Sequence, residues 1–384
     1  MKKNKLFNFS YALFIVLIFS QYSCNKHTTN SAENNHKTIH VGVFNGNGAS
    51  TVCVIETIES LKTDPDINPF PVSAFEIMDG ALESMDVLVF PGGSGSKEYN
   101  NLGIEAGILV KEFARKKDKG LVGICAGGYL MATSPGYPSL EILPAKTIRE
   151  HYNRGRGLIS FYVDENLLKV FPEFSGMDSA FIQYYDGPIY EITDSSAISI
   201  LGQIKSDIAT HYGDPTGVTP GRPAFATMNY GDGKVFVSVG HPEATQGMRW
   251  IVPRMVRWVS NKPLISYEGS IVQPKIYSNQ ILYYPEMIKY EKENFWKLFD
   301  TNDTIVIGAL NNLQAIYSRP SIRWALGLLR HNSPEIRIAA ANYLLKAEYT
   351  YAIPDIKAAI NNEDNPSTKN DLNSILIKLE NIIQ

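Results

Sequence analysis

The chain has 384 residues, which is more than one average domain, and its 44% hydrophobic and 20% charged residues are ordinary for a globular protein. The formal net charge is only -3, so no large basic surface is expected. Phosphate binding depends on clustered lysines and arginines, and nucleic acid is therefore excluded as the main partner. Composition indicates two or three globular domains and nothing narrower.

The N-terminus is expected to direct export. Three lysines within the first five residues precede an apolar run from Tyr11 to Phe19, which is short for a membrane-spanning helix but suits a signal-peptide core. A small residue precedes Cys24, and this resembles a bacterial lipoprotein signal in which Cys24 becomes lipidated; an ordinary secretory signal is the alternative. Residues 1–23 are predicted to be the signal peptide and 24–37 a polar tether, so the protein is expected to be lipid-anchored in the cell envelope, in the outer membrane or facing the periplasm.

Residues 38–262 show the pattern of an α/β domain. Short apolar runs alternate with helical stretches, and strands are expected at 39–44, 70–75, 86–90 and 120–124. This spacing favours a mostly parallel sheet with helices on both faces. Further strands are expected at 158–163, 180–185, 198–205, 224–229 and 234–239, followed by a helix at 247–260.

The C-terminal part is expected to be a linker over 263–302 and a helical segment over 303–384. Ser333 and Pro334 are typical of a helix start, and apolar residues then recur at a helical period. The sequences Pro320-Ser321-Ile322-Arg323 and Pro334-Glu335-Ile336-Arg337 are similar. The segment therefore resembles stacked HEAT-type repeats; a small helical cap or oligomerisation module is the alternative, and another envelope protein is a possible partner for these helices.

Cys125 is the candidate nucleophile. It lies in Gly123-Ile124-Cys125-Ala126-Gly127, after an apolar strand and at the start of a helix, which is the context of a nucleophile elbow. The helix N-terminus is expected to lower the pKa of the thiol. The N–H groups of Ala126 and Gly93 are expected to stabilise an oxyanion. Cys53, by contrast, is expected to be a small hydrophobic side chain in the core.

A thiol nucleophile needs a base and an orienting group. His241 follows the last expected strand and Glu243 comes two residues later. Strand ends at one edge of a parallel sheet collect catalytic groups, so the sequence predicts a triad of Cys125, His241 and Glu243. The remaining histidines show no metal-ligand spacing, and neither a metal nor a cofactor is expected.

This chain order is also the order of nucleophile, base and orienter in class I glutamine amidotransferases. Residues 38–262 resemble the amidotransferase-like domain found at the N-terminus of biotin-protein ligases. The resemblance rests on Val41-Gly42-Val43-Phe44, Phe90-Pro91-Gly92-Gly93, Gly123 to Tyr129, Tyr185-Asp186-Gly187-Pro188 and Gly240-His241-Pro242-Glu243. It implies the flavodoxin-like amidotransferase fold, with Gly92 and Tyr185 beside the substrate, and it does not imply biotin ligation.

The sequence therefore predicts a cysteine-dependent amidase, or related C–N hydrolase, that acts on a small amide or peptide-like substrate. Glutamine amidotransfer is less expected, because a helical tail cannot use the ammonia that such enzymes deliver. The alternative is a lipid-anchored protein that keeps the fold but binds a ligand, or another protein, without converting it.

Overall fold

The computed structural model describes residues 38–148, 156–208, 217–245, 247–267, 285–316, 318–319 and 321–382. The expected signal peptide, the lipidation site Cys24 and the tether lie outside these residues. Within the described part, no helix has both the length and the apolar character needed to cross a membrane.

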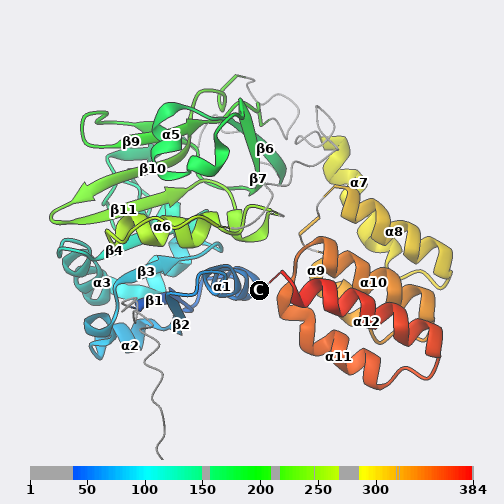
Figure 1. Ribbon diagram of the computed structural model, residues 1–384. Coiled ribbons are helices and arrows are strands. Elements are labelled where there is room, and N and C mark those ends of the chain that lie inside the picture. Colours follow the sequence, from blue (N-terminus) through cyan, green and yellow to red (C-terminus); the bar gives the residue numbers. More distant parts are fainter. Residues whose placement is uncertain are drawn as a thin grey trace, which may run out of the picture. The chain divides into compact units, whose positions relative to one another are not determined.

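A seven-stranded sheet forms the centre of the N-terminal part (Figure 1). Its order is β2 (Ile67–Val72), β1 (Ile39–Phe44), β3 (Val87–Phe90), β4 (Gly120–Ile124), β11 (Gly233–Ser238), β10 (Pro223–Tyr230) and β9 (Ser199–Gln203). The strands from β2 to β11 are parallel, and β10 and β9 continue the sheet antiparallel. The predicted α/β class with a mostly parallel sheet is confirmed.

The first edge strand starts earlier than predicted. β2 contains Pro69 and Pro71, which are tolerated because an edge strand needs ladder hydrogen bonds on one side only. Phe75, predicted to end this strand, lies instead in the short helix α2 (Ala74–Met78), where Ser73 and Glu76 form a capping box.

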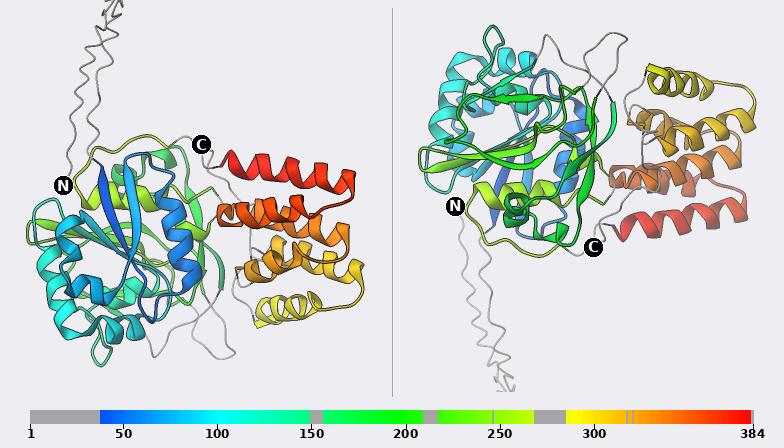
Figure 2. Two further views of the ribbon diagram at one scale, coloured as in Figure 1. Left: turned by 90° about the horizontal axis from the view of Figure 1, so that it is seen from below. Right: turned by 90° about the horizontal axis from the view of Figure 1, so that it is seen from above.

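Helices cover both faces of the sheet (Figures 1 and 2). α1 (Thr51–Leu61) packs on β1 and β2 and contacts α6 (Ile251–Val259), which lies on β4 and β11; α3 (Gly95–Ala114) and α4 (Ala126–Met131) pack together on the other side. The four central strands β1, β3, β4 and β11 are mostly apolar and almost wholly buried, as expected for a sheet covered on both faces.

Two small antiparallel ribbons follow α4. One joins β5 (Ala145–Thr147) to β8 (Tyr190–Ile192), and the other joins β6 (Arg156–Tyr162) to β7 (Ser179–Tyr185). The α5 helix (Glu165–Val170) and η2 (Pro172–Phe174) connect β6 to β7. These ribbons position Tyr185 at the end of β7.

The C-terminal part is helical, as predicted. It comprises α7 (Pro285–Lys297), α8 (Asp303–Ala315), α9 (Ile322–Leu328), α10 (Pro334–Lys346), η4 (Thr350–Ala352), α11 (Ile353–Asn361) and α12 (Pro366–Glu380). The Ser333 hydroxyl caps α10 by accepting from the Ile336 N–H at 3.4 Å. α7 falls inside the expected linker 263–302, so the helices begin by Pro285. The HEAT-type repeat stays a prediction.

Residues 37–384 form one unit with two separate apolar cores, one around the sheet and one among the C-terminal helices. Charged and polar groups connect the two. The Arg249 guanidinium donates to the Glu348 carbonyl at 2.6 Å, and the Glu348 carboxylate accepts from the Gly247 N–H at 3.0 Å. These contacts hold the C-terminal helices beside the carboxyl ends of the central strands.

Candidate functional site

Cys125 occupies the sharp turn between β4 and α4. Its backbone has φ 51° and ψ -100°, a conformation that L-residues rarely adopt. The flanking glycines make the turn possible: a Cβ on Gly127 would lie 2.2 Å from the Phe90 carbonyl oxygen, and one on Gly123 would lie 2.7 Å from the Gly127 oxygen. The predicted elbow is therefore present, and it presents the sulfur at the carboxyl edge of the sheet.

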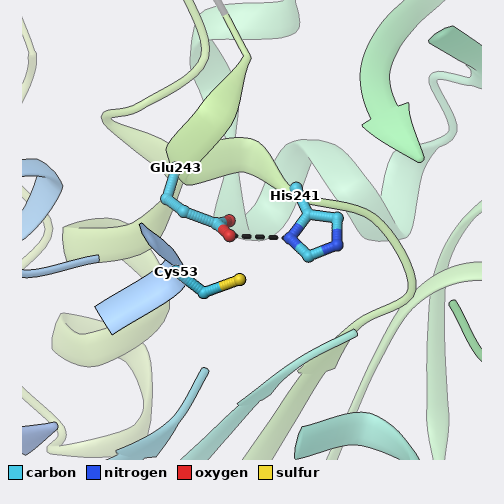
Figure 3. A group of neighbouring side chains, drawn as sticks. All are labelled: Cys53, His241 and Glu243. Atoms are coloured by element: carbon cyan, nitrogen blue, oxygen red, sulfur yellow. Dashed lines mark hydrogen bonds and ion pairs between the residues drawn. The ribbon is translucent and has the colours of Figure 1, made fainter. Parts of the chain in front are cut away.

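His241 and Glu243 follow β11 at the same edge. The His241 N–H donates to the Gln183 carbonyl at 2.7 Å, which fixes its backbone against β7. Its ring Nδ1 lies 2.7 Å from Glu243 Oε1, and both side chains are buried (Figure 3). A ring nitrogen beside a carboxylate carries the proton, so Nε2 keeps the lone pair that a general base needs.

The protonation states suit this arrangement. Burial and the nearby Arg319 charge lower the pKa of His241, against the opposing effect of Glu243, so the ring is neutral. Burial alone would raise the pKa of Glu243, but His241 and the Arg319 charge outweigh burial and lower it. The pair is a neutral imidazole oriented by an ionised carboxylate.

Cys125 and His241 line one pocket of about 420 Å³, together with Tyr185 and Gly93. The Cys125 thiol donates to the Tyr185 carbonyl at 3.5 Å. Gly92 lies beneath the imidazole, where a Cβ would be 2.5 Å from His241 Cε1. The structure thus brings together the predicted nucleophile, base, orienter and neighbouring glycines.

Two backbone N–H groups, on Ala126 directly after Cys125 and on the pocket residue Gly93, remain available for a ligand. The N–H of Gly127 donates to the Pro91 carbonyl at 3.2 Å and that of Ser94 donates to the Gly48 carbonyl at 2.8 Å. Within the described part of the chain, the N–H groups of Ala126 and Gly93 have no intramolecular acceptor. They are the groups predicted to stabilise an oxyanion.

The expectation of a lowered pKa at Cys125 is wrong. Burial raises the pKa of this thiol well above its ordinary value, with smaller raising effects from Cys53, Glu243 and Glu98 and an opposing effect of Arg319. Desolvation of the thiolate thus outweighs the helix N-terminus. Cys125 is therefore a neutral thiol in this environment, and any reaction of its sulfur as a nucleophile would require loss of that proton.

Cys53 is a site residue that the sequence reasoning assigned to the core. It is buried, but its sulfur lines the same pocket as Cys125, and burial raises the pKa of the thiol to about 11. Figure 3 shows the sulfur on the side of the imidazole that faces Glu243, with Nε2 pointing away. One feature of the sequence could have indicated this position of Cys53. The helix that contains Cys53, α1, begins soon after β1, and therefore at the sheet edge where Cys125 lies.

Arg319 is the second residue of the Cys125 pocket that the sequence did not indicate. It lies between α8 and α9, far along the chain, and its guanidinium forms an ion pair with Glu56 on α1. It also lies 3.6 Å from Glu243 Oε1 and donates to the Cys53 sulfur at 3.3 Å. Cys53, Glu56 and Glu243 are buried and the Arg319 side chain is only 10% exposed, so Arg319 interacts with two carboxylates in a region of low dielectric.

Cys53, His241 and Glu243 also form the only group in the described residues that offers three potential metal ligands, with ligand atoms within 4.8 Å of one another. Spacing along the sequence gave no sign of it. A metal bound there would occupy both His241 and Glu243, beside the cationic Arg319. The charge of Arg319 opposes a second cation.

No protein-family model matches the sequence, and no curated protein matches it. Among solved structures, the chain is similar to the glutaminase domain of Trypanosoma brucei CTPS with bound acivicin, at 12% identity, covering 62% of this chain and 98% of that one with a TM-score of 0.40. A thua-like protein from Parabacteroides merdae shares 11% identity, with 65% and 96% coverage and a TM-score of 0.42. The cytoplasmic protein STM3548 from Salmonella typhimurium shares 14% identity, with 58% and 97% coverage and a TM-score of 0.35.

Proposed function

We propose that the protein is a cysteine hydrolase that cleaves a C–N bond in an amide, with Cys125 as nucleophile. The observation that carries the proposal is the elbow at Cys125, which shares a pocket with an imidazole held at 2.7 Å by Glu243. Strained backbone at a nucleophile is maintained only where the surrounding structure fixes it. The fold itself hosts many chemistries and does not decide the reaction.

The reaction begins with a neutral thiol and a neutral imidazole. The Cys125 proton passes to His241 Nε2 as the sulfur attacks the carbonyl carbon of the amide. The developing oxyanion accepts hydrogen bonds from the N–H groups of Ala126 and Gly93. His241 then gives the proton to the departing nitrogen, which leaves as an amine and yields a thioester on Cys125.

Hydrolysis of the thioester restores the enzyme. His241 Nε2 takes a proton from a water molecule, the hydroxide attacks the thioester carbonyl, and the acid product leaves as the sulfur recovers its proton. Glu243 stays ionised throughout and stabilises the imidazolium that forms in each step. Cys53 lies on the Glu243 side of the ring (Figure 3), so it is not placed to exchange protons with Nε2.

The test compares the two pocket cysteines. Cys125→Ala should abolish hydrolysis over a panel of amides and short peptides, while Cys53→Ala should retain measurable turnover. A trapped acyl group on Cys125, seen by peptide mass spectrometry, would identify the intermediate. Equal turnover by wild type and Cys125→Ala would refute the proposal, as would failure of Cys125 to react with iodoacetamide at any pH at which the protein is folded.

One observation favours a second candidate, a binding protein without catalysis. The pKa of Cys125 is raised by burial, which slows a thiol nucleophile. A ligand that raises the melting temperature equally in wild type and Cys125→Ala, without turnover in either, would support this candidate.

We further propose that the domain belongs to the biotin-protein ligase N-terminal type of amidotransferase-like proteins, and that it is tethered in the cell envelope through lipidated Cys24. Retention of the wild-type protein in a membrane fraction, lost in Cys24→Ala, would support the anchor. Identical release of both proteins in soluble form would refute it.

A further inference from the structure

The C-terminal helices supply one wall of the pocket that contains Cys125. Phe295 on α7, Trp324 on α9, and the residues Arg319 and Arg323 line this pocket together with Cys125. The ring centroids of Phe295 and Trp324 lie 5.7 Å apart, nearly perpendicular at 79°. The wall is therefore aromatic and cationic, and no carboxylate lines this pocket among the described residues.

The two arginines differ in their charge balance. Arg319 is compensated by Glu56 and Glu243. Arg323 is exposed, and within the described residues it has no ion-pair or hydrogen-bond partner. The pocket therefore has one uncompensated positive charge at its helical wall, although the whole chain has a net charge of -3.

Trp324 beside Arg323 is also unusual for a surface residue. Its side chain is 45% exposed, and Phe299 on the same aromatic cluster is 51% exposed; their ring centroids are 4.9 Å apart. Large exposed aromatic groups next to a polar anchor are typical of a recognition surface. Here they adjoin the pocket that contains the nucleophile.

We propose that the amide cleaved at Cys125 carries a carboxylate, which Arg323 binds, and an apolar group that packs on Phe295 and Trp324. This inference rests on the proposed function and names its substrate class. A guanidinium matches the two oxygens of a carboxylate, and the aromatic wall provides apolar area with little loss of side-chain entropy. The C-terminal helices thus determine specificity, while the α/β part performs the chemistry.

The test measures alkylation of Cys125 in the full chain by iodoacetate and by iodoacetamide, two reagents of similar size that differ in a carboxylate. Peptide mass spectrometry quantifies the adduct on Cys125 separately from Cys24 and Cys53. The iodoacetate-to-iodoacetamide rate ratio, normalised to free cysteine, should fall on the order of tenfold in Arg323→Gln at low salt and be largely restored in Arg323→Lys. Salt at about 0.5 M should reduce the wild-type ratio.

The matched control is Arg330→Gln, which removes the same charge from an arginine whose side chain is 79% exposed and pairs with Asp355 outside the pocket. Its ratio should equal that of wild type. An unchanged ratio in Arg323→Gln, or an equal fall in both variants, overturns the inference and leaves the proposed function intact. Absence of any Cys125 adduct with either reagent overturns the proposed function, and the inference with it.

Discussion

Removal of the Arg319 charge tests whether the C-terminal part sets the charge states of the His241–Glu243 pair. Arg319→Met keeps most of the side-chain length but removes the cation that pairs with Glu56 and lies 3.6 Å from Glu243, whose side chains are only 4% and 0% exposed. The Arg249 charge, which also acts on both carboxylates, remains. Loss of one partner of a buried ion pair typically costs about 3–5 kcal/mol of unfolding free energy. Glu56 limits the cost, because it can take up a proton.

The direction in which the stability of Arg319→Met changes with pH follows from Glu56. Burial already raises the pKa of this carboxyl, although Arg319 opposes the rise, and loss of Arg319 raises it further. A carboxyl with a raised pKa lowers stability as pH rises between its unfolded and folded pKa values. The stability deficit of Arg319→Met should therefore be about 3 kcal/mol near pH 8 and clearly smaller near pH 5.

Arg319→Met should also change the pKa of His241. The Arg319 charge contributes, after burial, to the lowered pKa of His241, so Arg319→Met should raise that pKa toward its ordinary value. Nuclear magnetic resonance of the His241 ring measures this directly. In a rate profile, the acidic limb should move to higher pH, because His241 becomes protonated earlier.

Arg337→Met is the matched control. Arg337 pairs with Glu363 at 2.9 Å within the C-terminal helices, with side chains 16% and 3% exposed, and neither residue lines the Cys125 pocket. It should lower stability without moving the His241 pKa. The double variant Arg319→Met, Glu56→Gln should recover part of the stability lost in Arg319→Met. A cost below about 1 kcal/mol together with an unmoved His241 pKa would refute the reasoning.

Three further predictions concern the neighbouring groups. Gly92→Ala should reduce turnover at least ~100-fold in a folded protein, because its Cβ would lie 2.5 Å from His241 Cε1 and 2.8 Å from the Cys53 sulfur. Circular dichroism checks that the variant is folded, and a near-normal kcat in the folded variant would contradict the prediction. Alkylation of Cys125 by iodoacetamide should be slower at neutral pH than that of a free thiol and should increase above the ordinary thiol range, because burial raises its pKa; a plateau below pH ~8 would show a stabilised thiolate. Glu98 is buried with both carboxylate oxygens unpaired among the described residues, and burial raises its pKa to about 8. Folded Glu98 keeps a proton that the unfolded chain loses, so the free energy of unfolding falls as pH rises from the ordinary pKa of 4.5 toward 8. Glu98→Gln should therefore raise the free energy of unfolding, measured in urea, by about 3 kcal/mol at pH 7 and by little at pH 4. An equal gain at both pH values would show that the gain does not come from the raised pKa of Glu98.

The sequence alone was sufficient for those parts of the protein that depend on local pattern. Apolar runs of strand length alternating with helical periods predicted the α/β class, and the glycines around Cys125 predicted the elbow because only glycine fits so close to Phe90. The contact between His241 and Glu243 at the sheet edge that carries Cys125 could be anticipated because the carboxyl ends of parallel strands meet at one edge, while their catalytic roles stay a prediction. The helical character of the C-terminal segment followed from its caps and periodicity, whereas α7 was missed in a segment that was expected to be a linker.

Only the tertiary structure decided what surrounds these residues. Arg319 follows Cys53 by 266 positions, and no local pattern predicts that its guanidinium reaches Glu243. The raised pKa of Cys125 has the same origin, because desolvation depends on everything packed around the sulfur and not on the helix that follows it. The sequence thus determined which groups could react, and long-range packing determined their charge states and which helical residues line the Cys125 pocket.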